Sequence, residues 1–425
     1  QLHSYIIKSG FGSNVFVSAA MVRFYRGTES LVDAYKVLVE IPQPSVISWN
    51  TLISGFVQSG KFRKALGLFL ELERSVVCAN AYSFTAALGA CGKLSLLQLG
   101  RSIHAKIVKN GLECGNVVEN CLVDMYGKCG SVEEAIWVFD DMIDRDIISW
   151  NSAIAAYVNR NSAEEGLEFF RKMHVMDMQM DLFTFSIILS GVASLAALTW
   201  GVMIHCCTVK HGLNSSIVVG SALIDMYSKC GLMKDAESIF QSLPKKNLVT
   251  WNAMISGYVQ NGNSTKVIQL FEQLKILKDL KPDEVSFLNV LAACSNNEMS
   301  QKAMCYFESM VKDYGIEPSV EHCCTMIRLM GQRGEVWRAV RMTHELGFGS
   351  IGVVWRTLLG ACGTCRDLKV AKIAAAKLIE LEGDDDYVYV MLANIFACYG
   401  KWGDVNVVRK LMREKGVRKE VGCSW

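Results

Sequence analysis

Cysteine is the residue type whose spacing in this chain most directly suggests chemistry. The chain contains 16 cysteines in 425 residues, and Cys362 and Cys365 form a Cys-x-x-Cys pair of the kind found in redox and zinc sites. A zinc site would need a second pair of cysteines or histidines at suitable spacing, and the sequence offers none. Other cysteines recur before a glycine, as at Cys129 and Cys230, which favours small buried side chains in a reducing compartment. We therefore expect no metal site and no cofactor.

Motifs for catalysis are also missing. The sequence has no HExxH helix, no glycine-rich phosphate loop and no recognisable hydrolytic triad. Its formal net charge of +2 lacks the basic excess that is typical of nucleic-acid-binding domains, so any such binding must rest on local contacts. The composition, 51% hydrophobic and 20% charged, permits a large buried core. We predict that the chain is not itself an enzyme.

The elements that must position any functional residues follow from an internal repeat. An interval of 101 residues separates the members of three sets: Trp49, Trp150 and Trp251; His3, His104 and His205; Tyr25, Tyr126 and Tyr227. An interval shared by three residue types indicates a repeated structural unit. Each period divides into units of 35, 35 and 31 residues. The complete units that we infer are 15–45, 46–80, 81–115, 116–146, 147–181, 182–216, 217–247, 248–283, 284–319 and 320–351.

Each unit is predicted to form two helices. In unit 46–80, apolar residues between Leu52 and Val57 recur at helical spacing, Gly60 interrupts the chain, and a second stripe begins at Ala65. Two such helices cannot bury both stripes alone, so neighbouring units must stack. The predicted fold class is therefore all-α, a right-handed superhelical solenoid of stacked helix-turn-helix repeats. Residues 1–14 would be the end of an earlier unit.

Two features could suggest other functions. The repeated tryptophans could stack on bases, but their helical spacing beside Ile and Val favours core packing, and the repeated histidines are also expected to pack rather than to bind a ligand. The segment Leu182 to Val209 has no charged residue and is long enough to span a bilayer. Because the segment one period earlier, Ala81 to Val108, carries three basic residues, we predict two buried helices and no membrane contact.

The alternation of unit lengths resembles the PLS class of plant pentatricopeptide repeat (PPR) proteins, in which 35-residue P, 35-residue L and 31-residue S units follow in order. The segments at 48–50 (Ser-Trp-Asn), 124–130 (Asp-Met-Tyr-Gly-Lys-Cys-Gly) and 224–231 (Ile-Asp-Met-Tyr-Ser-Lys-Cys-Gly) carry the same resemblance. Assigned in this order, residues 1–14 end an L unit, 15–45 is S, 46–80 is P, 81–115 is L, and so on to the S unit 320–351. The resemblance implies binding of single-stranded RNA, about one base per unit, and no DNA partner.

In that family the fifth residue of a unit and its last residue select the base, and we call these two residues the base-reading pair. Carried over to this sequence, the pairs are Asn50 with Asn80 (pyrimidine), Asn120 with Asp146 (U), Asn151 with Asp181 (U), Ser221 with Asn247 (A) and Asn252 with Asp283 (U). An amide offers both a donor and an acceptor to the edge of an unstacked base. Each such residue could instead only cap a helix, but recurrence in register favours base reading. The other units are not decoded, so the expected ligand is pyrimidine-x-U-U-x-A-U.

The second residues of these five units are all apolar and β-branched: Ile47, Val117, Ile148, Val218 and Val249. Such side chains are stiff at χ1. The resemblance implies that they sandwich each base between adjacent units.

The C-terminal part resembles the family's E motifs. Residues 352–386, which include Val354 and Trp355, resemble the first, and 387–425 resembles the second through Leu392-Ala-Asn-Ile-Phe396, Lys401-Trp402 and Val421-Gly-Cys-Ser-Trp425. In the family such tails mark factors for C-to-U editing of organellar transcripts, and longer members continue into a DYW-type cytidine deaminase. That domain needs His-x-Glu, and none of the seven histidines has Glu two residues later. We expect the DYW domain to be lacking.

Three functions remain open at this point. The first is a site-recognition factor for RNA editing that recruits a DYW-type deaminase in trans, together with editing cofactor proteins, through the E-like motifs. The second is an organellar splicing or transcript-stabilising factor, and the third is a tetratricopeptide-like protein scaffold. The regular amide and carboxylate pairs argue against the third, and the tail favours the first over the second. A mitochondrial location is expected, with the chloroplast as the alternative, and residues are expected to precede the first one because the chain starts in mid-unit.

Overall fold

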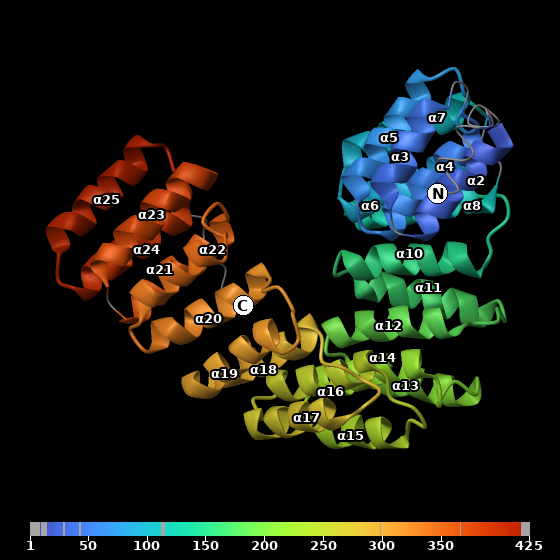
Figure 1. The fold of residues 1–425 in the computed structure, drawn as a ribbon. Coiled ribbons are helices and arrows are strands. Elements are labelled where there is room, and N and C mark those ends of the chain that lie inside the picture. The colour runs from blue at the N-terminus through green and yellow to red at the C-terminus, as the bar shows by residue number, and fades with distance from the viewer. Residues whose placement is uncertain are drawn as a thin grey trace. The chain divides into compact units, whose positions relative to one another are not determined.

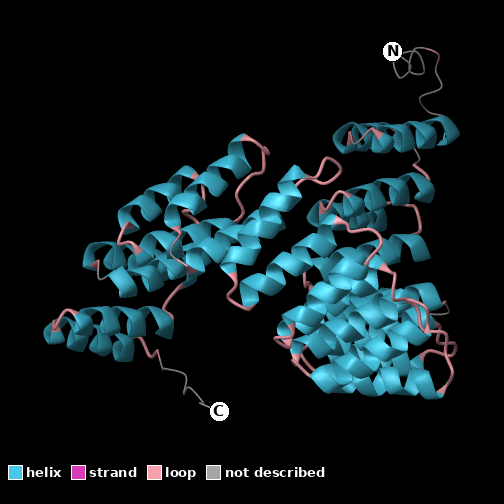
Figure 2. Ribbon diagram, turned by 90° about the horizontal axis from the view of Figure 1, so that it is seen from below, coloured by secondary structure: helices cyan, strands magenta, loops and turns pink. Residues whose placement is uncertain are grey.

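A computed structural model describes residues 9, 15–28, 30–41, 44–111, 115–297, 299–365 and 367–417. Throughout these residues the regular secondary structure is helical, which confirms the all-α class (Figures 1 and 2). The helices follow one another as pairs joined by short turns. Three features of the sequence lie outside the described residues: His3, the motif Val421–Trp425, and the partial unit before residue 15 except for residue 9.

The first helix of each pair has 13 residues in all of the PPR-like units. These helices are α2 (Val15–Gly27), α4 (Val46–Gln58), α6 (Ala81–Lys93), α8 (Asn116–Lys128), α10 (Ile147–Asn159), α12 (Leu182–Ser194), α14 (Ile217–Lys229), α16 (Leu248–Gln260), α18 (Glu284–Asn296) and α20 (Val320–Gln332), followed by α22 (Gly352–Cys365) and α24 (Asp386–Cys398). All but α24 begin at the first residue of an inferred unit, and α24 begins one residue earlier. We therefore keep the proposed unit boundaries.

The second helices explain the difference in unit length. They are α3 (Leu31–Glu40), α5 (Phe62–Arg74), α7 (Leu97–Lys109), α9 (Val132–Asp141), α11 (Ala163–Val175), α13 (Leu198–Lys210), α15 (Met233–Ser242), α17 (Ser264–Ile276), α19 (Ser300–Lys312) and α21 (Val336–Glu345), followed by α23 (Leu368–Glu382) and α25 (Trp402–Glu414). In the short units this helix has 10 residues, whereas in the long units it has 13. The short unit thus lacks roughly one helical turn.

The chain divides into two compact units, residues 1–226 and 227–425. Within each, contacts follow the order of the helices. For example, α4 packs against its own partner α5 and against the next first helix α6, and α5 also packs against α6. The same pattern joins α20, α21 and α22. This nearest-neighbour packing is the arrangement expected for stacked repeats.

The turn between the two helices of unit 46–80 shows how the chain reverses. Gly60 has a φ of 71°, in the left-handed region that favours glycine. The backbone N–H of Lys61 donates to the carbonyl of Phe56 at 2.9 Å, and that of Gly60 donates to the carbonyl of Val57 at 3.1 Å. These two bonds form a Schellman motif, which ends α4 at the predicted position.

The repeated aromatic residues belong to the core. Trp49, Trp150 and Trp251 are 6–8% exposed, which confirms that they pack rather than present a face to a ligand. Of the repeated histidines, His104 lies with Nδ1 2.9 Å from the hydroxyl of Tyr126. That contact joins α7 to α8 and is structural in kind.

The uncharged segment Leu182 to Val209 is divided between two helices, because α12 ends at Ser194 and α13 begins at Leu198. Phe185, Ile188 and Leu189 on α12 are fully buried. Among the residues that the structure describes, no helix has both the length and the apolar character to cross a membrane.

Small residues let some first helices approach closely. A Cβ added at Gly127 on α8 would lie 2.7 Å from the Cβ of Ala156 on α10. The same relation holds between Gly331 on α20 and Ala361 on α22, at 2.6 Å. Since neither glycine has a positive φ, the close approach of the neighbouring helix is what requires a residue without a side chain there.

Candidate nucleic-acid interface

The two members of a base-reading pair occupy different structural positions. The fifth residues, such as Asn151, lie inside first helices. The last residues lie at helix starts and cap the first helix of the next unit: Asn80 caps α6, Asp146 caps α10, Asp181 caps α12, Asn247 caps α16 and Asp283 caps α18. The capping role that the sequence left open is therefore realised for the last residues, and the fifth residues need another explanation.

The fold brings the members of four pairs into direct contact. In each, the amide Nδ2 of the fifth residue donates to Oδ1 of the last residue: Asn50 to Asn80 at 2.9 Å, Asn120 to Asp146 at 3.2 Å, Asn151 to Asp181 at 3.2 Å, and Asn252 to Asp283 at 3.0 Å. These residues are about 30 positions apart in sequence, and the contact arises because consecutive first helices lie side by side.

The remaining predicted pair, Ser221 with Asn247, consists of residues from different compact units of the chain. Ser221 lies on α14, where its hydroxyl donates to the carbonyl of Ile217 at 2.8 Å. Asn247 caps α16 by accepting from the backbone N–H of Thr250 at 3.0 Å. Each residue therefore has a defined local role within its own compact unit.

The acceptor oxygens of the paired asparagines differ in what they contact. Oδ1 of Asn50 accepts from the hydroxyl of Ser83, and Oδ1 of Asn252 accepts from the hydroxyl of Ser286, both at 2.7 Å. Oδ1 of Asn120 and of Asn151 is buried and has no hydrogen-bond partner among the described protein groups. A buried acceptor without a partner is costly, and a bound group that donates a hydrogen bond, such as the N3–H of uracil, would satisfy it.

Two of the aspartate members, Asp146 and Asp181, are held as carboxylates. Burial alone would raise the pKa of Asp146, but hydrogen bonds from the Ser149 backbone N–H, the Ser149 hydroxyl and the Asn120 amide outweigh it, so the pKa lies below its usual value. The pKa of Asp181 is lowered in the same way, with Thr184 in place of Ser149. A carboxylate can only accept hydrogen bonds, so it fixes each asparagine with its amide nitrogen toward the aspartate.

These serine and threonine side chains were missed in the sequence. They are the third residues of the units that follow the pairs, and with the last residues they form reciprocal capping boxes at α6, α10, α12 and α18. The pattern Asp-x-x-Ser or Asp-x-x-Thr before an apolar run, as in 146–149 and 181–184, was the available signal. Their hydroxyls complete the network that orients the base-reading pairs.

The effect of one such hydroxyl can be tested with Ser149→Ala. The pKa of the Asp146 carboxyl should rise toward its usual value of 3.8, because one of the hydrogen bonds that stabilise the charged form is lost. A depressed pKa stabilises the fold above the unfolded-state value, and this contribution is lost as the pH falls through the folded value. In the variant this contribution should be smaller, and its loss should be complete at a higher pH. Carbon NMR of labelled aspartate carboxyls measures the pKa of Asp146, with Asp181 in the same molecule as the unchanged control. An unaltered Asp146 titration would contradict the network.

The second residues of the five decoded units are exposed. The exposed fractions of Ile47, Val117, Ile148, Val218 and Val249 range from 40% to 67%. Apolar β-branched residues in a helix normally face the core, so this recurrence at one position of the first helix needs a reason beyond packing. It supplies a stiff apolar surface next to each pair, of the kind that a flat base could contact.

The Cys-x-x-Cys pair has no sign of redox or metal chemistry. Cys362 is buried, and its burial raises the pKa of its thiol to about 12, so a reactive thiolate is disfavoured. The cysteines of the described segments are free thiols. In the same segments no group of three or more His, Cys, Asp or Glu side chains is placed to hold a metal ion.

Comparison with protein families gives matches along the chain. The PPR repeat family matches residues 44–93, 145–194 and 246–288, and a related PPR repeat description matches 120–147, 221–248 and 285–314. The E motif matches residues 366–425.

Several curated relatives come from Arabidopsis thaliana. A pentatricopeptide repeat-containing protein is 48% identical over 492 aligned residues, which cover 100% of this chain and 85% of the relative. A mitochondrial member is 35% identical and a chloroplastic member 34% identical, each over 100% of this chain and 49% of its own length. The chain therefore spans about half the length of these two.

Among solved structures, the maize pentatricopeptide repeat protein PPR10 has the same fold. Its crystal structure superposes with a TM-score of 0.60 at 17% identity over 94% of this chain and 64% of the maize chain. PPR10 in complex with an 18-nucleotide psaJ RNA element gives a TM-score of 0.61 at 18% identity, over 93% of this chain and 60% of that one. These matches confirm the predicted repeat-solenoid fold.

Proposed function

Because this chain belongs to the pentatricopeptide repeat family and carries its E motif over residues 366–425, we propose that it binds single-stranded RNA in a sequence-specific way in a plant organelle. The observation that carries the proposal is the direct hydrogen bond within four base-reading pairs, at 2.9–3.2 Å. Helix capping alone accounts for the last residues but not for asparagines inside the first helices. Base selection accounts for both.

The proposed ligand is pyrimidine-x-U-U-x-A-U. The two adjacent uridines correspond to Asn120 with Asp146 and Asn151 with Asp181, the two pairs whose asparagine oxygens are buried without a partner. A single-stranded RNA is required because its bases can leave the stack and present their edges to side chains. The solved complex of PPR10 with an RNA element supports RNA as the ligand class.

Within this function, the proposed task is recognition of a site for C-to-U editing. The E motif favours this task, and a DYW-type deaminase acting in trans, with editing cofactor proteins at the E-like motifs, would supply the chemistry. Relatives named as mitochondrial and as chloroplastic support an organelle, with the mitochondrion preferred. Splicing or stabilisation of an organellar transcript is the alternative.

Direct binding tests the proposal. The RNA pyrimidine-x-U-U-x-A-U should bind more tightly than the same RNA with A-A in place of U-U, by at least about tenfold, since each lost base contact costs roughly 1–3 kcal/mol. The formal net charge of +2 predicts only modest weakening as salt increases. Fluorescence anisotropy with labelled oligonucleotides gives both results. Equal affinity for the two RNAs would disprove base selection.

The editing task needs a separate experiment. A plant that lacks this protein should lose conversion of one organellar cytidine to uridine while the transcript is spliced and accumulates normally. RNA sequencing of both organelles measures all three. Normal editing with an unspliced or depleted transcript would instead establish the alternative.

A further inference from the structure

A pair of aromatic side chains recurs at the interval of 101 residues. In the compact unit of residues 1–226, Phe139 on α9 lies edge-on to Trp150 on α10, with ring centroids 5.0 Å apart and ring planes at 77°. In the compact unit of residues 227–425, Phe240 on α15 lies in the same way against Trp251 on α16, at 5.1 Å and 82°. We call each pair an aromatic frame. The internal geometry of the two frames is nearly the same.

In the first frame a further ring completes the packing. The ring of Phe169 on α11 has its centroid 5.6 Å from that of Phe139 and 5.7 Å from that of Trp150. The ring of Tyr157 lies 5.3 Å from it as well. These separations are in the range that pairs of aromatic side chains favour. One phenyl ring is therefore in contact with three others.

The second frame lacks this ring. The residue one period after Phe169 is Leu270 on α17. A cavity of about 220 Å³ lies there, and Phe240, Tyr258 and Leu270 are among the residues that line it. Met254 lines it too, so the cavity persists although this side chain is larger than the alanine one period earlier. The cavity thus corresponds to a place that a phenyl ring fills in the first frame.

The walls of this cavity suit an aromatic ring. Phe240 and Tyr258 offer aromatic surface, and the flexible thioether of Met254 makes favourable contacts with rings. The charged groups of the wall, Glu237 and Lys266, pair with each other at 3.5 Å, and Glu237 also accepts from the Tyr258 hydroxyl. A cavity of roughly 150 Å³ is enough to bind benzene, so this one has room for a ring and the carbon that carries it.

Three exposed glutamines also line the cavity: Gln241 on α15, and Gln269 and Gln273 on α17. Within the part of the chain that the structure describes, their side chains form no hydrogen bond. A side-chain amide offers both a donor and an acceptor, which matches the groups of a peptide backbone. Amides on two helices are therefore available to a backbone that carries a ring into the cavity.

We propose that this cavity binds a phenylalanine side chain of a partner protein, whose backbone is held by the three glutamines. The inserted ring takes the place that Phe169 has in the first frame. A single aromatic side chain in a fitted pocket is a common energetic centre of protein–protein contacts. The site is built from α15, α16 and α17 and contains no base-reading residue, so it is separate from the proposed RNA-binding function.

The probe that tests this site is N-acetyl-phenylalanine methylamide, titrated into the whole chain. It should bind with a dissociation constant of about 1 mM or lower. N-acetyl-alanine methylamide lacks the ring and should bind at least about tenfold more weakly. Methyl NMR should show the largest shifts at Met254 and Leu270, because a bound ring lies beside them.

Filling the cavity from within should block the probe. Leu270→Phe should weaken binding at least about tenfold. Because the added ring could crowd the core, Leu270→Phe with Met254→Ala is measured as well; it restores the residues of the first frame and should show the same loss. Ile276→Phe is the matched control: it adds a ring to α17 at a position that is 79% exposed and does not line the cavity. Circular dichroism verifies that the variants are folded.

The reverse exchange should create a site. Phe169→Leu empties the first frame, so this variant should bind two probe molecules per chain. When Phe169→Leu is combined with Leu270→Phe, one probe should still bind, but the shift at Met254 should be lost.

A third arm distinguishes a peptide from a free aromatic compound. Gln269→Ala with Gln273→Ala should weaken binding of the peptide probe about fivefold, since hydrogen bonds to its backbone are lost, and should leave binding of benzyl alcohol unchanged. An equal effect on both probes, or none on either, would overturn a peptide as the ligand.

Other outcomes would overturn the site itself. One is failure of the unaltered protein to bind the phenylalanine probe more tightly than the alanine probe. Another is an equal loss of binding in Leu270→Phe and Ile276→Phe. A Phe169→Leu protein that still binds one probe would show that the aromatic frame does not recognise the ring. The proposed RNA-binding function is unaffected by each of these results.

Discussion

Replacing Asn151 by Ser and Asp181 by Asn is expected to change the preferred base at one RNA position from U to A. The resulting pair has the same residue types as Ser221 with Asn247, which the family resemblance assigns to A. In the unaltered protein Asn151 donates to the Asp181 carboxylate at 3.2 Å, and its oxygen is the acceptor that we propose for uracil N3–H. The exchange removes this arrangement, and about tenfold or more in relative affinity should move from U to A.

The exchange should leave the fold nearly unchanged. Asp181 caps α12 by accepting from the backbone N–H of Thr184 at 2.8 Å, and asparagine is as good a helix cap as aspartate. Anisotropy with two RNAs that differ at this position measures the preference. The matched control is Asn159→Ser, at the end of the same helix α10 and outside the pair, which should keep the preference for U. A variant that binds RNA yet still prefers U would contradict the assignment of this pair.

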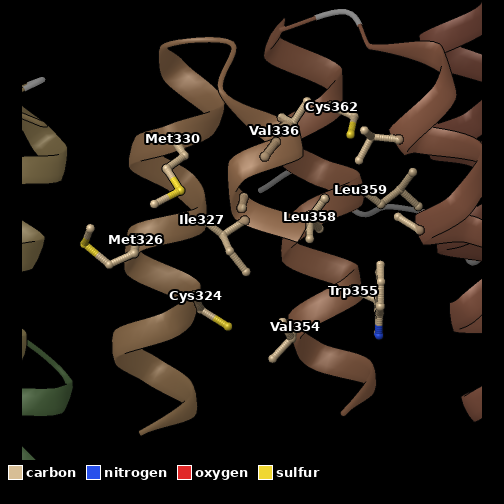
Figure 3. Packing of buried hydrophobic residues seen from close by; sticks show 14 of the residues in the cluster. Cys324, Met326, Ile327, Met330, Val336, Val354, Trp355, Leu358, Leu359 and Cys362 are labelled. Atoms are coloured by element: carbon tan, nitrogen blue, oxygen red, sulfur yellow. The ribbon is translucent and has the colours of Figure 1, made fainter. Parts of the chain in front are cut away.

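Replacing Trp355 by Ala is expected to destabilise the C-terminal hairpins by about 3–5 kcal/mol, the usual cost of removing a large aromatic side chain from a core. Trp355 is 1% exposed, lies in the core of α20 to α24 (Figure 3), and its Nε1 donates to the carbonyl of Gly349 at 2.9 Å. Truncation leaves both a void and an unpaired carbonyl.

The loss of stability caused by Trp355→Ala should stay local, because stacked repeats are stabilised mainly by their neighbours. Hydrogen exchange followed by mass spectrometry should show lost protection in α20 to α23 and little change in α4 to α6. Trp402→Ala is the control of the same residue type: Trp402 is 65% exposed, so its removal should cost less than about 0.5 kcal/mol. Equal destabilisation by the two substitutions would show that Trp355 does not organise this core.

The helices themselves were accessible from the sequence, because apolar stripes at helical spacing and the glycine at position 60 are local signals. Each first helix of the inferred units starts where the repeat begins. The shortened second helix of the 31-residue units was not accessible. Removing four residues from a unit can shorten either helix or a turn, and only packing against the next first helix decides among these.

The candidate site was only partly accessible. The pairs came from a family resemblance, since no local rule joins Asn120 to Asp146 or Asn50 to Asn80 across different spacings. Capping and base reading were treated as alternatives, although the structure shows that Asp146 caps α10 while also holding Asn120.

Because the last residue of a unit has two roles in this proposal, the changes of base preference that can be engineered into such a protein are limited. A side chain at this place caps the next helix and, in the proposed function, also faces the RNA, so the usable residues are short polar ones that can do both. Asn80, Asp146 and Asp181 are such helix caps. A residue chosen for the RNA alone would weaken the next helix by about 1 kcal/mol. Rewriting several positions at once would add these losses along the array. An engineered variant would therefore keep most of its stability when the residues at these positions are chosen from good helix caps.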